Sequence, residues 1–343
     1  MSAARTIIAV LCVVAGFAAI LSLIPVEAWP VELAASFRVQ IAVITTLAAG
    51  LALGLRARVP ATIAGAAALA CWASVVPLAL PASQPGAAGP SAGAIPSFRI
   101  LTINLEWSNR NASAVLGALR EAEPDILVLQ EVDNWWREQF TGLSDIFPVQ
   151  RFDPLSRRPG VAILLGRRIE LRDEAWLPLH GRPYADFVLA VARDASAGQA
   201  GATMAPSFRL TALHALPPRS ALLFRARTRQ LDDVRAHLLA RDGAEPQLVV
   251  GDFNMTIWSP SFRRFTRELH LERARLGFGL VPTWPTWNSL LQVPIDHILH
   301  SPGFVATSTR SITIPGSDHH GLLSDVLFIG RAPGDEPAPA KDS

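Results

Sequence analysis

The stretch Leu248–Asn254 reads LVVGDFN, an apolar run that reaches a glycine and then carries two polar residues around one phenylalanine. A short apolar run bounded by a turn residue is typical of a buried strand. An aspartate at the end of a single strand is usually a turn or helix-cap residue. The same pattern recurs on other apolar runs of the chain, and this recurrence indicates that Asp252 and Asn254 belong to a shared site.

Several other predicted strands also carry polar side chains at their ends. Apolar runs such as 208–213 and 293–299 are interrupted or followed by carboxylate, amide or imidazole groups. Together with the first stretch, the strand-end residues are Asn104, Glu106, Glu131, His214, Asp252, Asn254, Asp296, Asp318 and His319. Segments with helical spacing, 112–121 and 225–239, alternate with the strands. Two stacked sheets with helices outside would bring the polar strand ends together at one edge.

This set of side chains matches the needs of phosphoester hydrolysis. A divalent cation held by carboxylates can neutralise the phosphate. A histidine oriented by an aspartate can take a proton from the attacking water, and Asn or His donors can hold the phosphate oxygens. The chain has no HExxH motif, no Walker loop and no dinucleotide fingerprint, and its GxSxG match at residues 89–93 lies in a Pro-, Ala- and Gly-rich segment and not between a predicted strand and a helix. The residues therefore favour metal-dependent hydrolysis of a phosphoester.

Seven motifs stand in one order along the chain and resemble the endonuclease/exonuclease/phosphatase superfamily. They read TINLEW, PDILVLQEVD, GVAILL, TALHALPP, LVVGDFN, PIDHILH and GSDHHGLLSDV, and they cover roughly Phe98–Ile329. The resemblance implies a four-layer α/β sandwich, in which two packed mixed β-sheets are flanked by helices. It also implies a metal-dependent hydrolase acting on ester bonds, of the phosphodiesterase or endonuclease type.

The resemblance implies which residues lie at the metal. Glu131 resembles the principal Mg²⁺ ligand of the family, with Mn²⁺ as the alternative cation. Asp318 resembles a second acidic group near the metal, and Asn104 resembles the strand-end Asn beside it. Glu106 stands where many relatives have aspartate, and its longer side chain could reach the metal directly or through water.

The resemblance also implies which residues act on the water and the phosphate. His319 resembles the general base of the family, and Asp296 resembles the aspartate that orients this base. Asp252 and Asn254 resemble the groups that position the attacking water and the phosphate. His214 occupies the place of a phosphate-binding or acid-catalytic histidine.

The N-terminal part of the chain is far more apolar than the rest. Hydrophobic residues make up 50% of the sequence, and the mean hydropathy is +0.28. The runs Thr6–Ile24, Val39–Leu55 and Pro60–Leu80 carry no charge, and each has close to the ~20 residues that cross a bilayer. They predict three transmembrane helices. The first run could instead be a signal peptide, and buried helices of a soluble protein are the other alternative.

The charges next to these runs predict an orientation in the membrane. Arg5 precedes the first run, and Arg56 and Arg58 lie between the second and third. Positively charged loops stay in the cytoplasm. We therefore expect a multi-pass protein of a bacterial inner membrane, with everything after the third run on the periplasmic or extracellular side.

The composition divides the chain into four parts. Residues 1–80 form the predicted membrane anchor, and residues 81–96 form a linker rich in Pro, Ala and Gly. Residues 97–331 form the predicted catalytic domain, and residues 332–343 form a disordered tail. Both cysteines lie in the anchor, so the catalytic domain has no disulfide framework and no thiol nucleophile.

The substrate is the least determined property. A nuclease acting on nucleic acid is the favoured hypothesis, and the alternatives are a phospholipase-C-like or lipid or inositol phosphate phosphatase and a catalytically silent membrane protein. The net charge of +2 does not by itself argue for nucleic acid. Arg227, in a basic run, is expected on a solvated helix face. Trp284 and Trp287 could pack in the core, stack on a base or sugar, or enter lipid. Besides the substrate and the lipid bilayer, the sequence indicates no protein partner.

Overall fold

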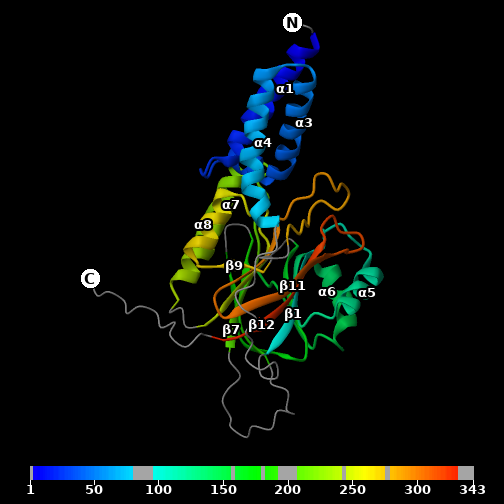
Figure 1. Ribbon diagram of the computed structural model, residues 1–343. Helices are drawn as coiled ribbons and strands as arrows, with labels where there is room; N and C mark the ends of the chain where they lie inside the picture. The colour runs from blue at the N-terminus through cyan, green and yellow to red at the C-terminus, as the bar shows by residue number, and fades with distance from the viewer. Residues whose placement is uncertain are drawn as a thin grey trace, which may run out of the picture.

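The computed structural model describes residues 3–79, 96–155, 159–178, 182–191, 207–241, 245–274 and 279–330. The predicted linker up to residue 95 and the predicted tail lie outside these residues. Within them, an N-terminal bundle of helices stands on a domain built from two β-sheets (Figure 1).

The N-terminal bundle contains four helices. They are α1 (Ala3–Leu23), α2 (Trp29–Ser36), α3 (Arg38–Gly54) and α4 (Arg58–Ala79). By length and composition, α1 and α4 could each cross a membrane, whereas α2 and α3 qualify only as a pair bent by 72°. The bundle therefore provides two candidate spans, or three if the bent pair is one span. The short helix α2 separates the first two predicted segments.

The second part of the chain folds into two six-stranded sheets. The first sheet has the order β11-β12-β1-β2-β4-β3, with β11 (Phe304–Ile312), β12 (Gly321–Phe328), β1 (Ser97–Asn104), β2 (Ile126–Val132), β4 (Gly160–Leu165) and β3 (Val149–Phe152). The second has the order β5-β6-β7-β8-β10-β9, with β5 (Ile169–Leu177), β6 (Tyr184–Val191), β7 (Ser207–His214), β8 (Gln247–Asp252), β10 (Asp296–His300) and β9 (Glu272–Arg273). The pairs β1/β2 and β7/β8 are parallel and the other neighbours antiparallel, so both sheets are mixed.

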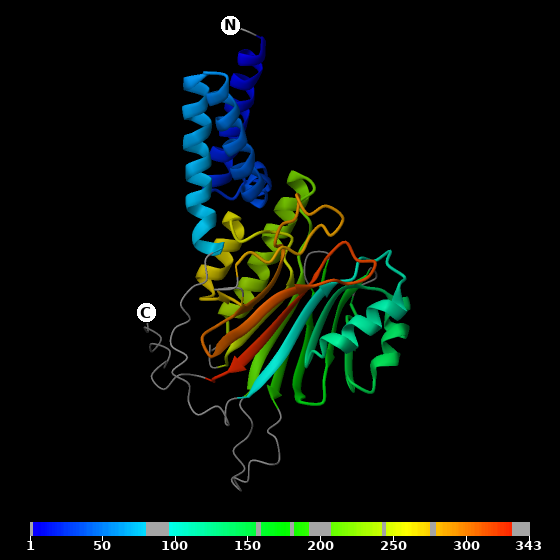
Figure 2. The ribbon, with the colours of Figure 1, turned by 45° about the vertical axis from the view of Figure 1, so that its right-hand side comes forward.

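The sheets pack face to face, and helices cover their outer faces (Figure 2). The core between them is apolar, and the stacked rings of Phe98 and Phe208, 5.3 Å apart, join β1 to β7 across it. The helices α5 (Ala112–Ala122) and α6 (Asn134–Phe140), with the short 3₁₀ helix η1 (Thr141–Leu143), cover the first sheet. The helices α7 (Ala221–Leu239) and α8 (Pro260–Glu268) cover the second. The predicted four-layer α/β sandwich is confirmed.

Local sequence signals explain where α7 and α8, the helices that cover the second sheet, begin. The side chain of Ser220 accepts a hydrogen bond from the backbone N–H of Leu223 and caps α7. Ser259 caps α8 in the same way, and Pro260 follows it at the first helical position, where its missing N–H costs nothing.

The strand register brings the polar ends to one edge of the sandwich. Asn104 of β1 is paired in register with Gln130 of β2, and His214 of β7 with Asp252 of β8. Asp296 begins β10 directly opposite Asp252. Parallel neighbours end on the same side, so all these side chains lie at one end of the two sheets.

Steric crowding explains why LVVGDFN has a glycine at position 251. Gly251 has a φ of +143°, and a Cβ there would lie 1.9 Å from the backbone oxygen of Leu213 on the neighbouring strand. The same Cβ would come within 3.3 Å of Gln130 Nε2 from the other sheet. Only glycine allows this close approach, which places Asp252 at the point where the two sheets meet.

The helical bundle packs against the layer of α7 and α8. Ala35 of α2 and Val75 of α4 belong to the same buried apolar cluster as Phe253 and Trp258. Trp258 also donates from Nε1 to the backbone oxygen of Ser74 at 3.4 Å. The end of the bundle that carries α2 is therefore fixed to the two-sheet domain by side-chain packing.

Candidate active site

Asn104, at the end of β1, joins carboxylates from both sheets. Its Nδ2 donates to Asp252 Oδ2 at 3.1 Å and lies 3.4 Å from Glu131 Oε1. Asn104 and Asp252 are buried, and the Glu131 side chain is 20% exposed. The amide thus holds two acidic groups from separate sheets next to each other.

The residues after Gly251 form a tight polar turn. The backbone N–H of Asn254 donates to Asp252 Oδ1 at 2.8 Å, and Asn254 Nδ2 donates to the backbone oxygen of Ala215 at 2.9 Å. Asn254 has a φ of +51°, a left-handed conformation that asparagine adopts more readily than most residues. Asp252 and Asn254 are thus fixed by each other and by the end of β7.

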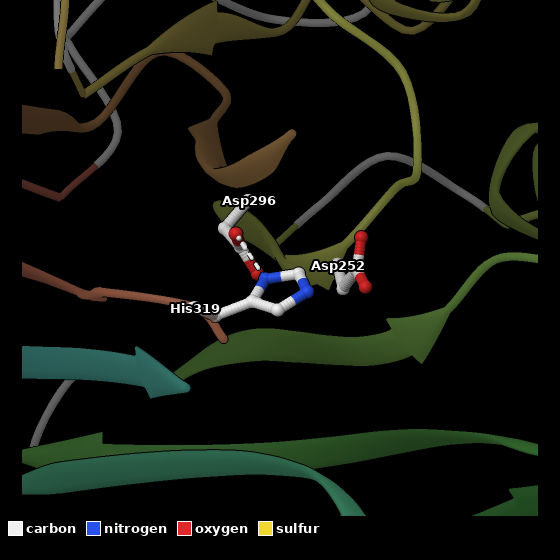
Figure 3. A group of neighbouring side chains, drawn as sticks. All are labelled: Asp252, Asp296 and His319. Carbon is white, nitrogen blue, oxygen red and sulfur yellow. Dashed lines mark hydrogen bonds and ion pairs between the residues drawn. The ribbon is translucent and has the colours of Figure 1, made fainter. Parts of the chain in front are cut away.

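His319 and Asp296 form a buried pair (Figure 3). His319 Nδ1 lies 3.0 Å from Asp296 Oδ2, and the other ring nitrogen points toward Asp252. Ser317 positions the loop, because its Oγ donates to the backbone oxygen of Asn104 at 2.7 Å and accepts from the N–H of His319 at 2.9 Å. A histidine with Nδ1 held by a carboxylate keeps Nε2 available for proton transfer.

The charges of the site shift the pKa of its buried groups. Burial lowers the pKa of His319, but the charge and hydrogen bond of Asp296 and the charge of Asp252 outweigh it and raise that pKa to about 9. Burial, with repulsion from Asp296, raises the pKa of Asp252 to about 7. Burial, with the positive charges of Arg182 and His319, moves the pKa of His214 well below its ordinary value. His319 is therefore protonated at neutral pH in the metal-free protein, and His214 is neutral.

The titration of His319 should depend on Asp296. In metal-free protein we expect the His319 ring to titrate near pH 9. In the Asp296→Asn variant the charge of Asp296 is lost while burial and Asp252 remain, so the pKa of His319 should fall below its value in the unmodified protein. NMR of ¹⁵N-histidine-labelled protein in nanodiscs measures both. A titration of His319 at the same pH in both proteins would contradict this electrostatic description.

Asp318 lies at the rim of the site, next to Trp284. Its Oδ1 lies 3.8 Å from His319 Nε2, and its Oδ2 accepts a hydrogen bond from Trp284 Nε1 at 2.9 Å. The Asp318 side chain is 35% exposed. Of the two tryptophans with open roles, Trp284 therefore supports a predicted acidic residue of the site.

The two glutamates predicted as ligands occupy different positions. Glu131 has a φ of +61°, its Oε2 accepts from the N–H of Trp107 at 2.9 Å, and its Oε1 lies 3.9 Å from His214 Nε2. Glu106 donates from its backbone N–H to Asn104 Oδ1 at 3.0 Å, while its carboxylate accepts from Ser108 Oγ. The Glu131 carboxylate lies inside the network, whereas Glu106 joins it through its backbone.

The acidic groups of the site could hold a metal ion. Asp252, Asp296 and His319 each offer a ligand atom, and these atoms lie within 4.8 Å of one another. The Glu131 carboxylate lies beside this group, because Asn104 Nδ2 approaches both Glu131 and Asp252. Carboxylate oxygens are the ligands that hard divalent cations prefer. Burial is the main cause of the raised pKa of Asp252, repulsion from Asp296 adds to it, and a bound cation would offset that repulsion.

Arg227 links the site to the helical bundle, and its predicted solvated position is wrong. Its Nη1 donates to the backbone oxygen of Asn254 at 2.6 Å, and its Nη2 donates to Glu32 Oε2 of α2 at 3.0 Å. Both side chains are 1% exposed. Ser261 Oγ and N–H donate to Glu32 Oε1 at 2.6 and 3.0 Å, and Ser259 Oγ donates to Oε2. A carboxylate of the anchor is thus buried beneath the Asn254 turn.

The sequence reasoning missed three further contributions. Ser317 precedes the SDH motif directly, so its position was visible but its double hydrogen bond was not. The N–H of Trp107 holds Glu131 and carries no side-chain signal. Glu32 is 195 residues from Arg227, and no spacing rule connects them.

A sequence profile described as "Endonuclease/Exonuclease/phosphatase family" matches residues 101–319. No curated protein matches the chain significantly.

The fold resembles several solved structures. D. rerio TDP2 complexed with single strand DNA product has a TM-score of 0.53 at 14% identity, covering 67% of this chain and 98% of that one. The human Nocturnin catalytic domain with bound sulfate anion has a TM-score of 0.51 at 19% identity, covering 68% and 94%. A family protein from Bacteroides thetaiotaomicron has a TM-score of 0.51 at 19% identity, covering 68% and 98%. At these identities, the similarity shows the fold alone.

Proposed function

Because the chain belongs to the endonuclease/exonuclease/phosphatase family, we propose that it hydrolyses a phosphodiester with a divalent cation and a water molecule. Members of this family are typically phosphoester hydrolases. The observation that carries the proposal is the buried His319–Asp296 pair, whose free ring nitrogen faces Asp252 while Glu131 lies beside Asp252 (Figure 3). This arrangement supplies a base, its orienting group and adjacent acidic ligands.

The chain's own residues have distinct tasks in the proposed reaction. His319 takes the proton of the attacking water at Nε2, and Asp296 holds Nδ1–H and stabilises the charge that develops on the ring. Asp252 accepts a hydrogen bond from the water and orients it. Neutral His214 would donate to a phosphate oxygen, and the amides of Asn104 and Asn254 hold Asp252 in position for the water and the phosphate.

The proposed cation is Mg²⁺, with Mn²⁺ as the alternative. Glu131 would be its principal ligand, with Asp318 and Glu106 near it or bound through water. When bound, the cation neutralises the phosphate charge and acts as a Lewis acid. It would also oppose the carboxylates that raise the pKa of His319, which favours the unprotonated form that a base requires.

Replacing Glu131 by Gln should raise the Mg²⁺ concentration needed for half-maximal activity by about tenfold or more. The substitution keeps the shape but removes the charge that favours a cation. The measurement is hydrolysis of bis(4-nitrophenyl) phosphate against Mg²⁺ concentration. Glu138→Gln on α6, on the surface, is the matched control. An unchanged Mg²⁺ requirement in Glu131→Gln would remove Glu131 from the ligand set.

We also propose that the helical bundle crosses a membrane more than once, with the catalytic domain on the periplasmic or extracellular side. Arg5 Nε donates to the backbone oxygen of Leu55, so Arg5, Arg56 and Arg58 gather at one end of the bundle. Glu27 and Glu32 lie at the other end, where they contact the catalytic domain. This charge distribution supports the orientation expected from the positive-inside rule.

The nuclease activity expected from the sequence is supported by one structural neighbour, D. rerio TDP2, which was crystallised with single strand DNA product. The surroundings of the present site differ from a nucleic-acid channel, because the anchor and several exposed apolar side chains lie next to it. Those residues favour a phosphodiester other than nucleic acid.

A further inference from the structure

One loop connects the helical bundle to the active site. The loop, residues 281–295, lies at the end of the catalytic domain that carries the bundle, as both ribbon views show in orange (Figures 1 and 2). Gln40, in the first turn of α3, donates from Nε2 to the backbone oxygens of Leu290 and Gln292 at 3.2 and 3.1 Å. These hydrogen bonds hold the loop beside the N-terminal end of α3, which together with α2 forms a candidate membrane-spanning segment.

Loop 281–295 is also hydrogen-bonded to the segment Ser317–His320, which contains His319. Trp284 Nε1 donates to Asp318 Oδ2 at 2.9 Å, and Thr286 Oγ1 donates to the backbone oxygen of Ser317 at 3.0 Å. Gln292 Nε2 lies 3.2 Å from His320 Nε2. A surface that contacts loop 281–295 therefore lies close to His319, the proposed base.

The side chains that the loop exposes are large and apolar. Leu290 is 80% exposed, Trp287 67% and Leu291 39%. Trp107, whose N–H holds Glu131, is 60% exposed on a second loop of the site. Tryptophan and leucine beside a membrane-spanning helix are typical of residues that enter the headgroup region of a bilayer. The bundle supplies the reason for their exposure, since it places a membrane next to them.

The polar groups at the site entrance argue against a nucleic-acid track. A protein that follows a nucleic-acid backbone presents Lys and Arg along its groove. Here Arg182 is a basic side chain close enough to affect His214, the carboxylates of Glu131 and Asp318 are partly exposed, and the exposed neighbours are Trp107, Trp287 and Leu290. An apolar rim around a small acidic, cation-binding site matches a headgroup phosphate that arrives from a lipid surface.

We propose that residues Trp287–Leu291 lie in the bilayer surface, and that the site opens onto this surface to cleave a phosphodiester in a membrane-lipid headgroup. The inference rests on the proposed function. Water oxygen forms a new P–O bond, one P–O ester bond breaks, and the departing alcohol oxygen takes a proton. The products are diacylglycerol with a phosphorylated headgroup, or phosphatidic acid with the headgroup alcohol.

The contact of loop 281–295 with the bilayer can be measured without an activity assay. The full chain, with Cys12 and Cys71 replaced by Ala, would carry a nitroxide at Leu290→Cys, or at Leu239→Cys as the matched control at the far end of α7. In nanodiscs of phosphatidylethanolamine and phosphatidylglycerol, we expect the label at 290 to be more accessible to oxygen than to a water-soluble nickel chelate. The label at 239 should show the reverse. A label at 290 as accessible to the chelate as the label at 239 would overturn the membrane contact.

Turnover distinguishes the substrate class from the proposed function. The full chain with Mg²⁺ would receive three substrates: lipids of mixed phosphatidylethanolamine, phosphatidylglycerol and cardiolipin nanodiscs, followed by ³¹P NMR, then plasmid DNA, and bis(4-nitrophenyl) phosphate. We expect lipid turnover, and we expect Leu290→Glu to lower it by about tenfold or more while soluble-diester turnover changes less than about twofold. Leu239→Glu should change neither.

Three other outcomes have separate meanings. Metal-dependent cleavage of plasmid or soluble diester without lipid turnover would overturn the lipid inference and leave the proposed function standing. No metal-dependent cleavage of any of the three substrates would overturn the proposed function itself. Equal losses on lipid and soluble diester in Leu290→Glu would also overturn the inference, because the loop would then act on the site and not on the membrane.

Discussion

Replacing His319 by Gln should lower kcat for a phosphodiester by about 10²- to 10⁴-fold, the range expected when a general base is lost. Gln can keep a hydrogen bond to Asp296, so the buried carboxylate retains a partner, but it cannot accept a proton from water. The loss should appear in kcat more than in KM, because the base acts in the transition state. Initial rates with bis(4-nitrophenyl) phosphate at saturating Mg²⁺ measure it.

The matched control for this variant is His270→Gln, which changes an exposed histidine outside the site. Thermal unfolding of both variants shows whether each is folded at the assay temperature, so that a loss of rate cannot be assigned to unfolding. A His319→Gln protein that is folded and retains more than about a tenth of the rate would exclude His319 as the base.

Replacing Glu32 by Gln should destabilise the catalytic domain by about 3–5 kcal/mol, the usual cost of removing one partner of a buried ion pair. Arg227 would keep its charge in a place where it is 1% exposed, with one of its two oxygen partners now neutral. The Arg227 side chain also holds the backbone oxygen of Asn254, so the turn that fixes Asp252 should loosen. Urea unfolding of the full chain in nanodiscs, followed by tryptophan fluorescence, measures the free energy.

Two further variants make this prediction specific. Glu27→Gln removes one of two acidic partners of Arg264, which also contacts Asp232, and since Glu27 and Arg264 are 25% and 27% exposed, its effect should stay near or below about 1 kcal/mol. The double variant Glu32→Gln with Arg227→Met should recover part of the stability, because no buried charge is left unpaired. Equal effects of Glu27→Gln and Glu32→Gln would show that the buried contact is not what fixes the anchor.

The four-layer fold was predicted mostly by the resemblance to the family, and the strand pattern agreed with it because the pattern depends on local rules. Apolar runs that end in polar residues, with glycine before Asp252, follow from burial and from the close approach of β7 and β8. The meeting of these ends at one edge follows from parallel pairing of β1 with β2 and of β7 with β8. The motifs then indicated which polar residues gather there, although their individual roles in catalysis stay predictions.

The contacts between the anchor and the catalytic domain could not be predicted in this way. Arg227 reads as one of several arginines on a helix, and only the docking of α2 shows that it is buried. The contact between Gln40 and Leu290 spans 250 residues, and neither residue has a pattern that indicates it. The position of the site relative to the helical bundle therefore depends on tertiary packing, which neither hydropathy nor motif spacing encodes.

The measurement that tests the central claim most directly uses the unmodified full chain in nanodiscs. Hydrolysis of bis(4-nitrophenyl) phosphate would be followed with Mg²⁺, after removal of metal with EDTA, and after Mg²⁺ is restored. The account predicts turnover that saturates with Mg²⁺, disappears with EDTA and returns when the cation is restored. Turnover that EDTA leaves unchanged, or no turnover at any concentration of Mg²⁺ or Mn²⁺, would contradict a metal-dependent phosphodiesterase at this site.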